Sequence, residues 1–113
     1  MAYDLSLAER IRRRLEVLPT RLEEKQMMGG LCFMVDGKMC VGILKDELMC
    51  RIDPALHDET VERPGCRTMD FTKRPMSGFV LVEPATLQSA QEFEYYIALA
   101  LAFNPRAKAT KKR

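Results

Sequence analysis

Hydrophobic and polar residues alternate along three short segments in the middle of the chain, between positions 28 and 52. A period of two is typical of β-strands. Asp36-Gly37 separates the first two segments and favours a type I′ hairpin, because both central residues of that turn need positive φ. Lys45-Asp46 separates the second and third segments and is a weaker turn signal. The pattern therefore predicts three antiparallel strands.

The two turns also predict which residues lie opposite each other. Counting back from Asp36-Gly37 places Phe33 opposite Cys40, and counting from the second turn places Ile43 opposite Leu48. Side chains alternate between the two faces of a strand, and opposed residues share a face. One face would then collect Cys32, Met34, Met39, Val41, Ile43, Leu48, Cys50 and Ile52. The other would collect Leu31, Phe33, Val35, Lys38, Cys40, Leu44, Glu47, Met49 and Arg51.

The first of these faces contains no charged residue, so we expect it to form the core beneath the helices. The second face is too apolar for an ordinary solvated sheet face, which predicts either a second layer or a partner. We interpret it as an interaction face through which the chain forms a homodimer. Its candidate residues are Leu31, Phe33, Val35, Cys40 and Met49.

Helical periodicity occurs near both ends of the chain. Residues 4–18 carry an apolar stripe, with Ser6 and Glu9 as a capping-box candidate. A second stripe runs from about residue 86 or 89 to Phe103. Residues 23–28 favour an edge strand leading into a bend at Gly29-Gly30, and residues 79–82 favour another strand.

The segments between these elements are less regular. A short surface helix is expected around His57, after Asp53-Pro54, and residues 62–79 are expected to be loops with short extended pieces. The fold class is therefore α+β: a two-layer sandwich, with an antiparallel sheet of about five strands and an N-terminal and a C-terminal helix packed on one face.

Composition is that of a soluble globular domain, with 47% hydrophobic and 30% charged residues. We expect one domain at 1–104 and a basic disordered tail at 105–113. Without the five cations of the tail, 13 basic residues stand against 16 acidic ones, so the body is a poor match for nucleic acid. Weak nucleic-acid contacts are expected only from the tail, through Arg106, Lys108, Lys111, Lys112 and Arg113. The N-terminal residues are charged and no apolar run is long enough to span a membrane, which predicts a cytoplasmic protein that binds no membrane.

The four cysteines show neither zinc-ligand nor dithiol spacing, and the chain has a single histidine. Cys32 and Cys50 would lie on one face with a strand between them, too far apart for a disulfide. We expect buried, reduced thiols, no metal and no cofactor.

Three basic residues of the irregular region, Arg67, Lys73 and Arg74, form a candidate anion-binding site together with Arg51 from the third strand. Guanidinium groups bind carboxylate or phosphate with two hydrogen bonds. The alternative is that these side chains pair with Asp70 or bond backbone carbonyls, and the absence of a phosphate-binding loop favours it.

Three segments together resemble one known family. They are MMGGLCFMVDGKM (27–39), DELMCR (46–51) and MDFTKRPMSGF (69–79). In this combination and order they are similar to the TfoX/Sxy N-terminal domain, over about residues 8–103, and to its single-domain members. The resemblance implies an α/β sandwich on an antiparallel sheet, a role in regulating competence genes alongside a transcription-regulator partner, and no catalytic residues.

Two functional classes follow. The favoured one is a non-enzymatic regulatory or protein-interaction module, acting as a homodimer or with a transcription-regulator protein. The alternative is a small-anion or nucleotide-binding domain, which could be an enzyme, built on the Arg/Lys cluster.

Overall fold

The computed structural model describes residues 3–27, 29–71 and 74–107 of the 113-residue chain. The elements, in chain order, are α1 (Leu5–Glu16), β1 (Leu22–Met27), β2 (Gly30–Val35), β3 (Lys38–Leu44), β4 (Glu47–Arg51), η1 (Pro54–Leu56), α2 (His57–Val61), β5 (Cys66–Phe71), β6 (Arg74–Val82), α3 (Pro84–Leu87), α4 (Ala90–Phe103) and η2 (Asn104–Arg106). The two η elements are single turns of 3-10 helix.

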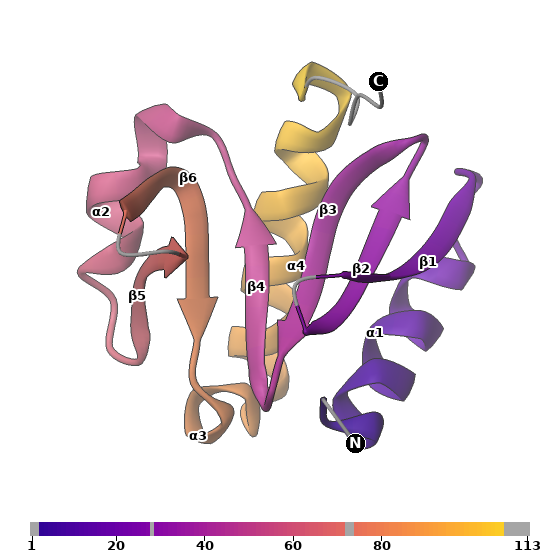
Figure 1. Ribbon diagram of the computed structural model, residues 1–113, viewed down its shortest axis with the longest axis horizontal. Coiled ribbons are helices and arrows are strands. Elements are labelled where there is room, and N and C mark those ends of the chain that lie inside the picture. The colour runs from indigo at the N-terminus through magenta and orange to yellow at the C-terminus, as the bar shows by residue number, and fades with distance from the viewer. Residues whose placement is uncertain (1–2, 28, 72–73, 108–113) are drawn as a thin grey trace.

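The strands form one antiparallel sheet in the order β1-β2-β3-β4-β6-β5 (Figure 1). Both α1 and α4 lie on the same side of this sheet, which confirms the predicted α+β architecture. The sheet has six strands where about five were expected. The additional strand is β5, which lies in the irregular segment between residues 62 and 79 and pairs with β6.

Both long helices begin at a capping side chain. Asp4, rather than the expected Ser6, caps α1, because its Oδ1 accepts hydrogen bonds from the backbone N–H groups of Ser6 (2.9 Å) and Leu7 (3.2 Å). Ser89 caps α4 by accepting from the N–H of Glu92 at 3.2 Å. The buried residues of the two helices are Leu7, Ala8, Ile11 and Leu15 in α1 and Phe93, Tyr96, Ile97 and Ala100 in α4.

The first hairpin has the predicted turn but not the predicted register. Asp36 and Gly37 both have positive φ, 53° and 79°, as a type I′ turn requires. Beyond the turn the register shifts, so that Phe33 lies opposite Val41 instead of Cys40. The shift is a β-bulge, in which Cys40 is an extra residue on β3.

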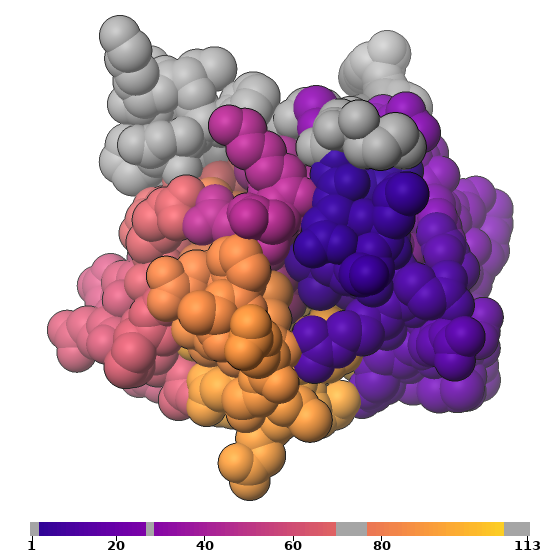
Figure 2. Space-filling view, turned by 90° about the horizontal axis from the view of Figure 1, so that it is seen from below, coloured from indigo at the N-terminus to yellow at the C-terminus, as the bar shows by residue number. Residues whose placement is uncertain are grey.

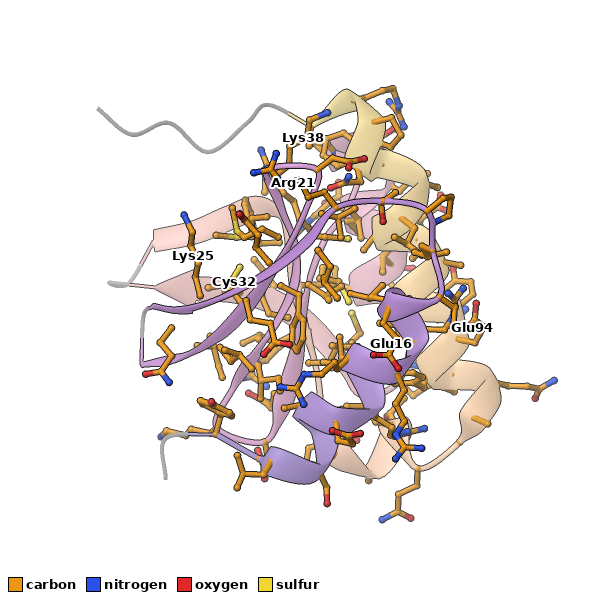
Figure 3. All side chains as sticks on the ribbon, turned by 90° about the vertical axis from the view of Figure 1, so that its right-hand side faces the viewer. Glu16, Arg21, Lys25, Cys32, Lys38 and Glu94 are labelled. Carbon is orange, nitrogen blue, oxygen red and sulfur yellow. The ribbon has the colours of Figure 1, made fainter. Side chains whose placement is uncertain are left out.

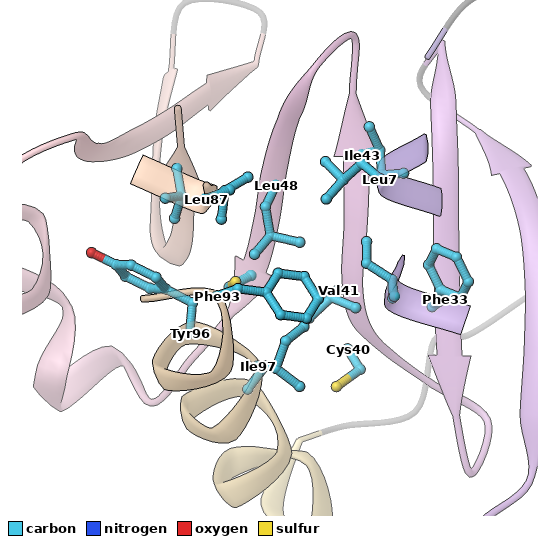
Figure 4. Packing of buried hydrophobic residues seen from close by; sticks show 14 of the residues in the cluster. Leu7, Phe33, Cys40, Val41, Ile43, Leu48, Leu87, Phe93, Tyr96 and Ile97 are labelled. Atoms are coloured by element: carbon cyan, nitrogen blue, oxygen red, sulfur yellow. The ribbon is translucent and has the colours of Figure 1, made fainter. Parts of the chain in front are cut away.

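This bulge reverses the faces assigned to β2. Leu31, Phe33 and Val35 point towards the helices, whereas Cys32 and Met34 point away from them. The bulged Cys40 also joins the core beneath the helices, beside Val41 (Figure 4). The second hairpin has the predicted register, with Ile43 opposite Leu48. Its core residues are confirmed: Val41, Ile43, Leu48, Cys50 and Ile52.

The two glycines at the start of β2, Gly29 and Gly30, have different structural roles, which predicts different costs of substitution. Gly29 has a φ of +76° and no atom within 4 Å of the position of a Cβ, so Gly29→Ala should cost about 1 kcal/mol of backbone strain. A Cβ on Gly30 would lie 1.9 Å from the carbonyl oxygen of Ile43 on β3. We expect Gly30→Ala to lower the free energy of unfolding by about 2–3 kcal/mol, because the backbones must separate. Urea titration of both variants tests this difference, and equal losses would contradict it.

Candidate functional site

Four of the five residues predicted to form an interaction face are buried beneath the helices. Leu31, Phe33, Val35 and Cys40 are each 5% exposed or less and belong to the core cluster that contains α1 and α4. Their predicted placement on the second face is therefore wrong, and the bulge at Cys40 is the physical reason. Met49 alone of the five lies on that face.

The second face is instead rich in sulfur. We call it the sulfur-rich face: its buried residues are Cys32, Met34, Met49, Met69 and Leu81, with Met39, Leu44 and Phe79 packed against them. Cys32 Sγ lies 3.8 Å from Met34 Sδ. Met49 is only 2% exposed in the single chain. These buried residues come from β2, β4, β5 and β6, and α1 and α4 lie on the opposite face of the sheet (Figure 3).

Two members of the predicted anion-binding cluster lie next to the sulfur-rich face. The Arg67 guanidinium binds the Glu47 carboxylate through both terminal nitrogens, one at 2.8 Å. The side chain of Asp70, the partner named in the alternative prediction, lies outside the described residues. The Arg51 guanidinium lies 5.6 Å from the ring centre of Phe79. Lys73 and the side chain of Arg74 lie outside the described residues, so the structure does not show this cluster assembled.

All four cysteines are buried free thiols, as predicted. Burial raises the pKa of Cys32 to about 11 and that of Cys40 to about 12. Burial also raises the pKa of Cys50 and of Cys66. A raised pKa suppresses the thiolate, which is the form that acts as nucleophile or metal ligand.

The placement of the thiols differs from the prediction in one respect. Cys50 lies in the core beneath the helices and Cys32 on the sulfur-rich face, so the sheet separates the two side chains that were expected to share a face. Within the described ranges, no three His, Cys, Asp or Glu side chains are grouped as a metal site would need.

His57 begins α2 in the predicted short helix, but its ring is buried rather than on the surface. The N–H of Gly78 donates to His57 Nδ1 at 2.9 Å, and His57 Nε2 lies 2.9 Å from Thr68 Oγ1. Because Nδ1 accepts, the hydrogen of the neutral ring is on Nε2 and is donated to Thr68. The imidazole thus joins α2 to β5 and β6, and both nitrogens are occupied.

Two arginines outside the predicted anion-binding cluster line surface pockets. Arg10 lines a pocket of about 220 Å³ between the start of α1 and α3, on the face shown in Figure 2. Its Nη1 donates to the carbonyl of Leu87 at 2.7 Å, and its guanidinium lies 4.1 Å from the ring centre of Phe93.

Arg63 lines a second pocket, of about 420 Å³, together with Thr86 and Ser89. Its guanidinium binds Glu92 at 2.9 Å and lies 3.8 Å from the ring centre of Tyr95. Intramolecular partners therefore hold both pocket arginines in place, and the Glu92 carboxylate offsets the charge of Arg63.

The folded domain continues three residues past its expected end at 104. Arg106 forms an ion pair with Asp53 at 2.9 Å, and Ala107 is buried. Lys38 Nζ donates to the carbonyl oxygens of Asn104 (3.3 Å) and Pro105 (3.1 Å). Arg106 is thus held by the domain, and the other tail cations, Lys108, Lys111, Lys112 and Arg113, lie outside the described residues.

The edge formed by β1 presents exposed charge. Glu23, Glu24, Lys25 and Gln26 are all exposed, and Arg12 of α1 binds both oxygens of Glu24, at 2.5 and 2.8 Å. This hydrogen bonding lowers the pKa of Glu24 and anchors the strand to α1. An edge strand was predicted at residues 23–28, and the structure confirms it at residues 22–27.

Comparison with known proteins decides the family. The sequence model of one protein family, the TfoX N-terminal domain, matches residues 15–104, which is most of the chain. The chain belongs to the TfoX N-terminal domain family. Neither the curated proteins nor the solved structures contain a match to it.

The match of the TfoX N-terminal domain begins within α1 and ends at Asn104, so it includes the whole sheet and α4. It confirms the resemblance found in the three sequence segments. No helix in the described parts of this TfoX N-terminal domain is long and apolar enough to cross a membrane.

Proposed function

We propose that this chain is a non-enzymatic regulatory domain that acts as a homodimer and binds a transcription-regulator protein. Membership of the TfoX N-terminal domain family carries the proposal, because the resemblance to TfoX/Sxy implies regulation of gene expression. A role in competence is the specific form that this regulation would take.

The chemistry of the described residues supports a binding role over a catalytic one. A nucleophilic cysteine needs a lowered pKa and a neighbouring base. Burial raises the pKa of all four thiols, and the single histidine uses both ring nitrogens to hold the fold together.

Transcript profiling of the native cell tests the proposal. Deletion of the gene should change a defined set of transcripts, and the wild-type chain supplied in trans should restore them. Unchanged transcripts would contradict the proposal. A thermal-shift screen against phosphorylated metabolites provides the second arm, where a ligand-induced shift that Arg74→Ala abolishes would favour the anion-binding alternative.

A further inference from the structure

The outer edge of β1 is open to a further strand. β1 comes first in the sheet order, and β2 is its one neighbour among the described strands. Figure 3 looks onto this edge, with Lys25 projecting from it. At the other end of the sheet, α2 packs against β5, and His57 bonds to Thr68 there. Exposed backbone N–H and C=O groups at a sheet edge are ready to pair with another strand.

The direction of the outward backbone groups follows from one hydrogen bond. The N–H of Asp36 donates to the carbonyl of Arg21 at 2.8 Å, so the backbone groups of Arg21 point towards β2. This direction alternates along an antiparallel pair. The N–H and C=O groups of Glu23 and Lys25 therefore also point inward, and those of Leu22, Glu24 and Gln26 point outward.

A second copy of β1 fits these outward groups with two-fold symmetry. In such a pairing one residue lies opposite its own copy, and residues at equal distances on either side lie opposite each other. With Glu24 at the centre, the outward groups of Leu22 and Gln26 bond to those of Gln26 and Leu22 in the second copy. The whole described strand then takes part.

The charges of β1 select this register. With Glu24 at the centre, Glu23 of each copy lies opposite Lys25 of the other, in the closer, non-hydrogen-bonded type of pair. If the two-fold axis passed through Lys25, the two copies of Lys25 would lie opposite each other. If it passed through Glu23, the two copies of Glu23 would lie opposite each other. The side chains of Glu23 and Lys25 are both exposed, and the contact of Glu23 with Arg21 is long, at 3.6 Å.

The like charges at the centre are compensated within each chain. Glu24 and its copy would lie opposite each other on the helix side of the sheet, and Arg12 binds each carboxylate with two hydrogen bonds. Charged residues on an edge normally prevent association. Here they are complementary to a second copy of the same strand.

From this geometry we propose that β1 is the dimer interface of this protein: two copies pair antiparallel about a two-fold axis at Glu24, joined by reciprocal Glu23–Lys25 pairs. The inference rests on the homodimer of the proposed function and specifies its surface.

Charge reversals test the register directly. Glu23→Lys leaves Lys opposite Lys at both pairs, and Lys25→Glu leaves Glu opposite Glu, so each variant should dissociate about tenfold more readily than the wild type. An equimolar mixture of the two variants restores both opposite-charge pairs and should form a heterodimer. The double variant Glu23→Lys with Lys25→Glu should form a homodimer again.

Sedimentation velocity over a concentration series measures these affinities, and circular dichroism checks that every variant is folded. Glu59→Lys, an exposed reversal on α2, is the matched control for Glu23→Lys and should dimerise like the wild type. Raising the salt concentration should weaken the wild-type dimer and strengthen the single-variant dimers, because salt screens attraction and repulsion alike.

Two results would overturn the proposal. One is a wild-type chain that stays monomeric at every concentration. The other is a folded pair of single variants that dimerise as tightly as the wild type, which would move the homodimer to another surface. A wild-type monomer would also remove the homodimer from the proposed function, whereas dimerising single variants would change only its surface. The transcript response is measured separately from both, so failure of this interface and failure of the regulatory function are distinguishable.

Discussion

Raising the pH from about 8 to about 10 should lower the free energy of unfolding by roughly 3 kcal/mol through Cys32 and Cys40 alone. Burial raises the pKa of Cys32 to about 11 and that of Cys40 to about 12, against 9.0 for an unperturbed thiol. At a pH between the unperturbed pKa of 9.0 and the raised pKa of each thiol, the unfolded chain has released the thiol proton and the folded chain keeps it. The folded state then binds more protons, so its stability is fully present below about pH 9 and falls as the pH rises.

Urea titrations at a series of pH values measure this loss. The pKa shifts of Cys50 and Cys66 act in the same direction. The matched control is Cys40→Ala, in which the loss between the two pH values should be smaller by about half of the loss expected from Cys32 and Cys40 together. Reaction of the native protein with a thiol reagent at pH 8 should also be slow at all four cysteines. Stability that stays flat up to pH 10 would show that the thiols are hydrated in the native state.

Truncation of Phe33 should have the largest effect of any single substitution considered. The side chain is 0% exposed and lies among α1 and sheet residues beneath the helices (Figure 4). Phe33→Ala removes buried apolar surface and leaves a cavity, so we expect a loss of about 3–5 kcal/mol in the free energy of unfolding. For a domain of this size such a loss approaches the whole stability.

This substitution separates the core placement of Phe33 from the exposed placement that the sequence pattern favoured. Urea unfolding at a fixed protein concentration is the measurement, because a dimer gains stability with concentration. The control is Val17→Ala, where the side chain is 74% exposed and the expected change is within about 0.5 kcal/mol. If the Phe33→Ala variant kept wild-type stability but self-associated more weakly, Phe33 would lie at an interface and not in the core.

The contrast between the two hairpins shows how far a local pattern specifies register. In β3 and β4 the turn at Lys45-Asp46 led to the observed pairing and to the correct core residues. In β2, residues 30–35 are all buried, so neither face is marked by polar side chains. A strand that is apolar on both faces does not show by alternation which face is inside. One bulged residue, Cys40, was then enough to reverse the assignment of the whole strand.

Candidate binding residues were harder to predict than the fold, because the long-range partner of a charged side chain is not encoded in local spacing. The pairing of Arg67 with Glu47 depends on β6 lying between β4 and β5. Arg63 meets Glu92 across 29 positions of sequence, and Arg12 meets Glu24 only because α1 lies beside β1. The exposed charges of β1 were visible in the sequence, but pairing them in the proposed dimer requires knowing which backbone groups of the strand point outward.

The sequence by itself determined the two long helices, the Asp36-Gly37 turn, the antiparallel α+β architecture and the family, because caps, turns and periodicity are local properties of the chain. Only the tertiary structure decided the bulge at Cys40, the sixth strand β5, the burial of His57 and the face to which Phe33 belongs. These features depend on how strands and helices distant in sequence pack against one another, and packing energy, not local preference, selects among registers that the pattern leaves equal.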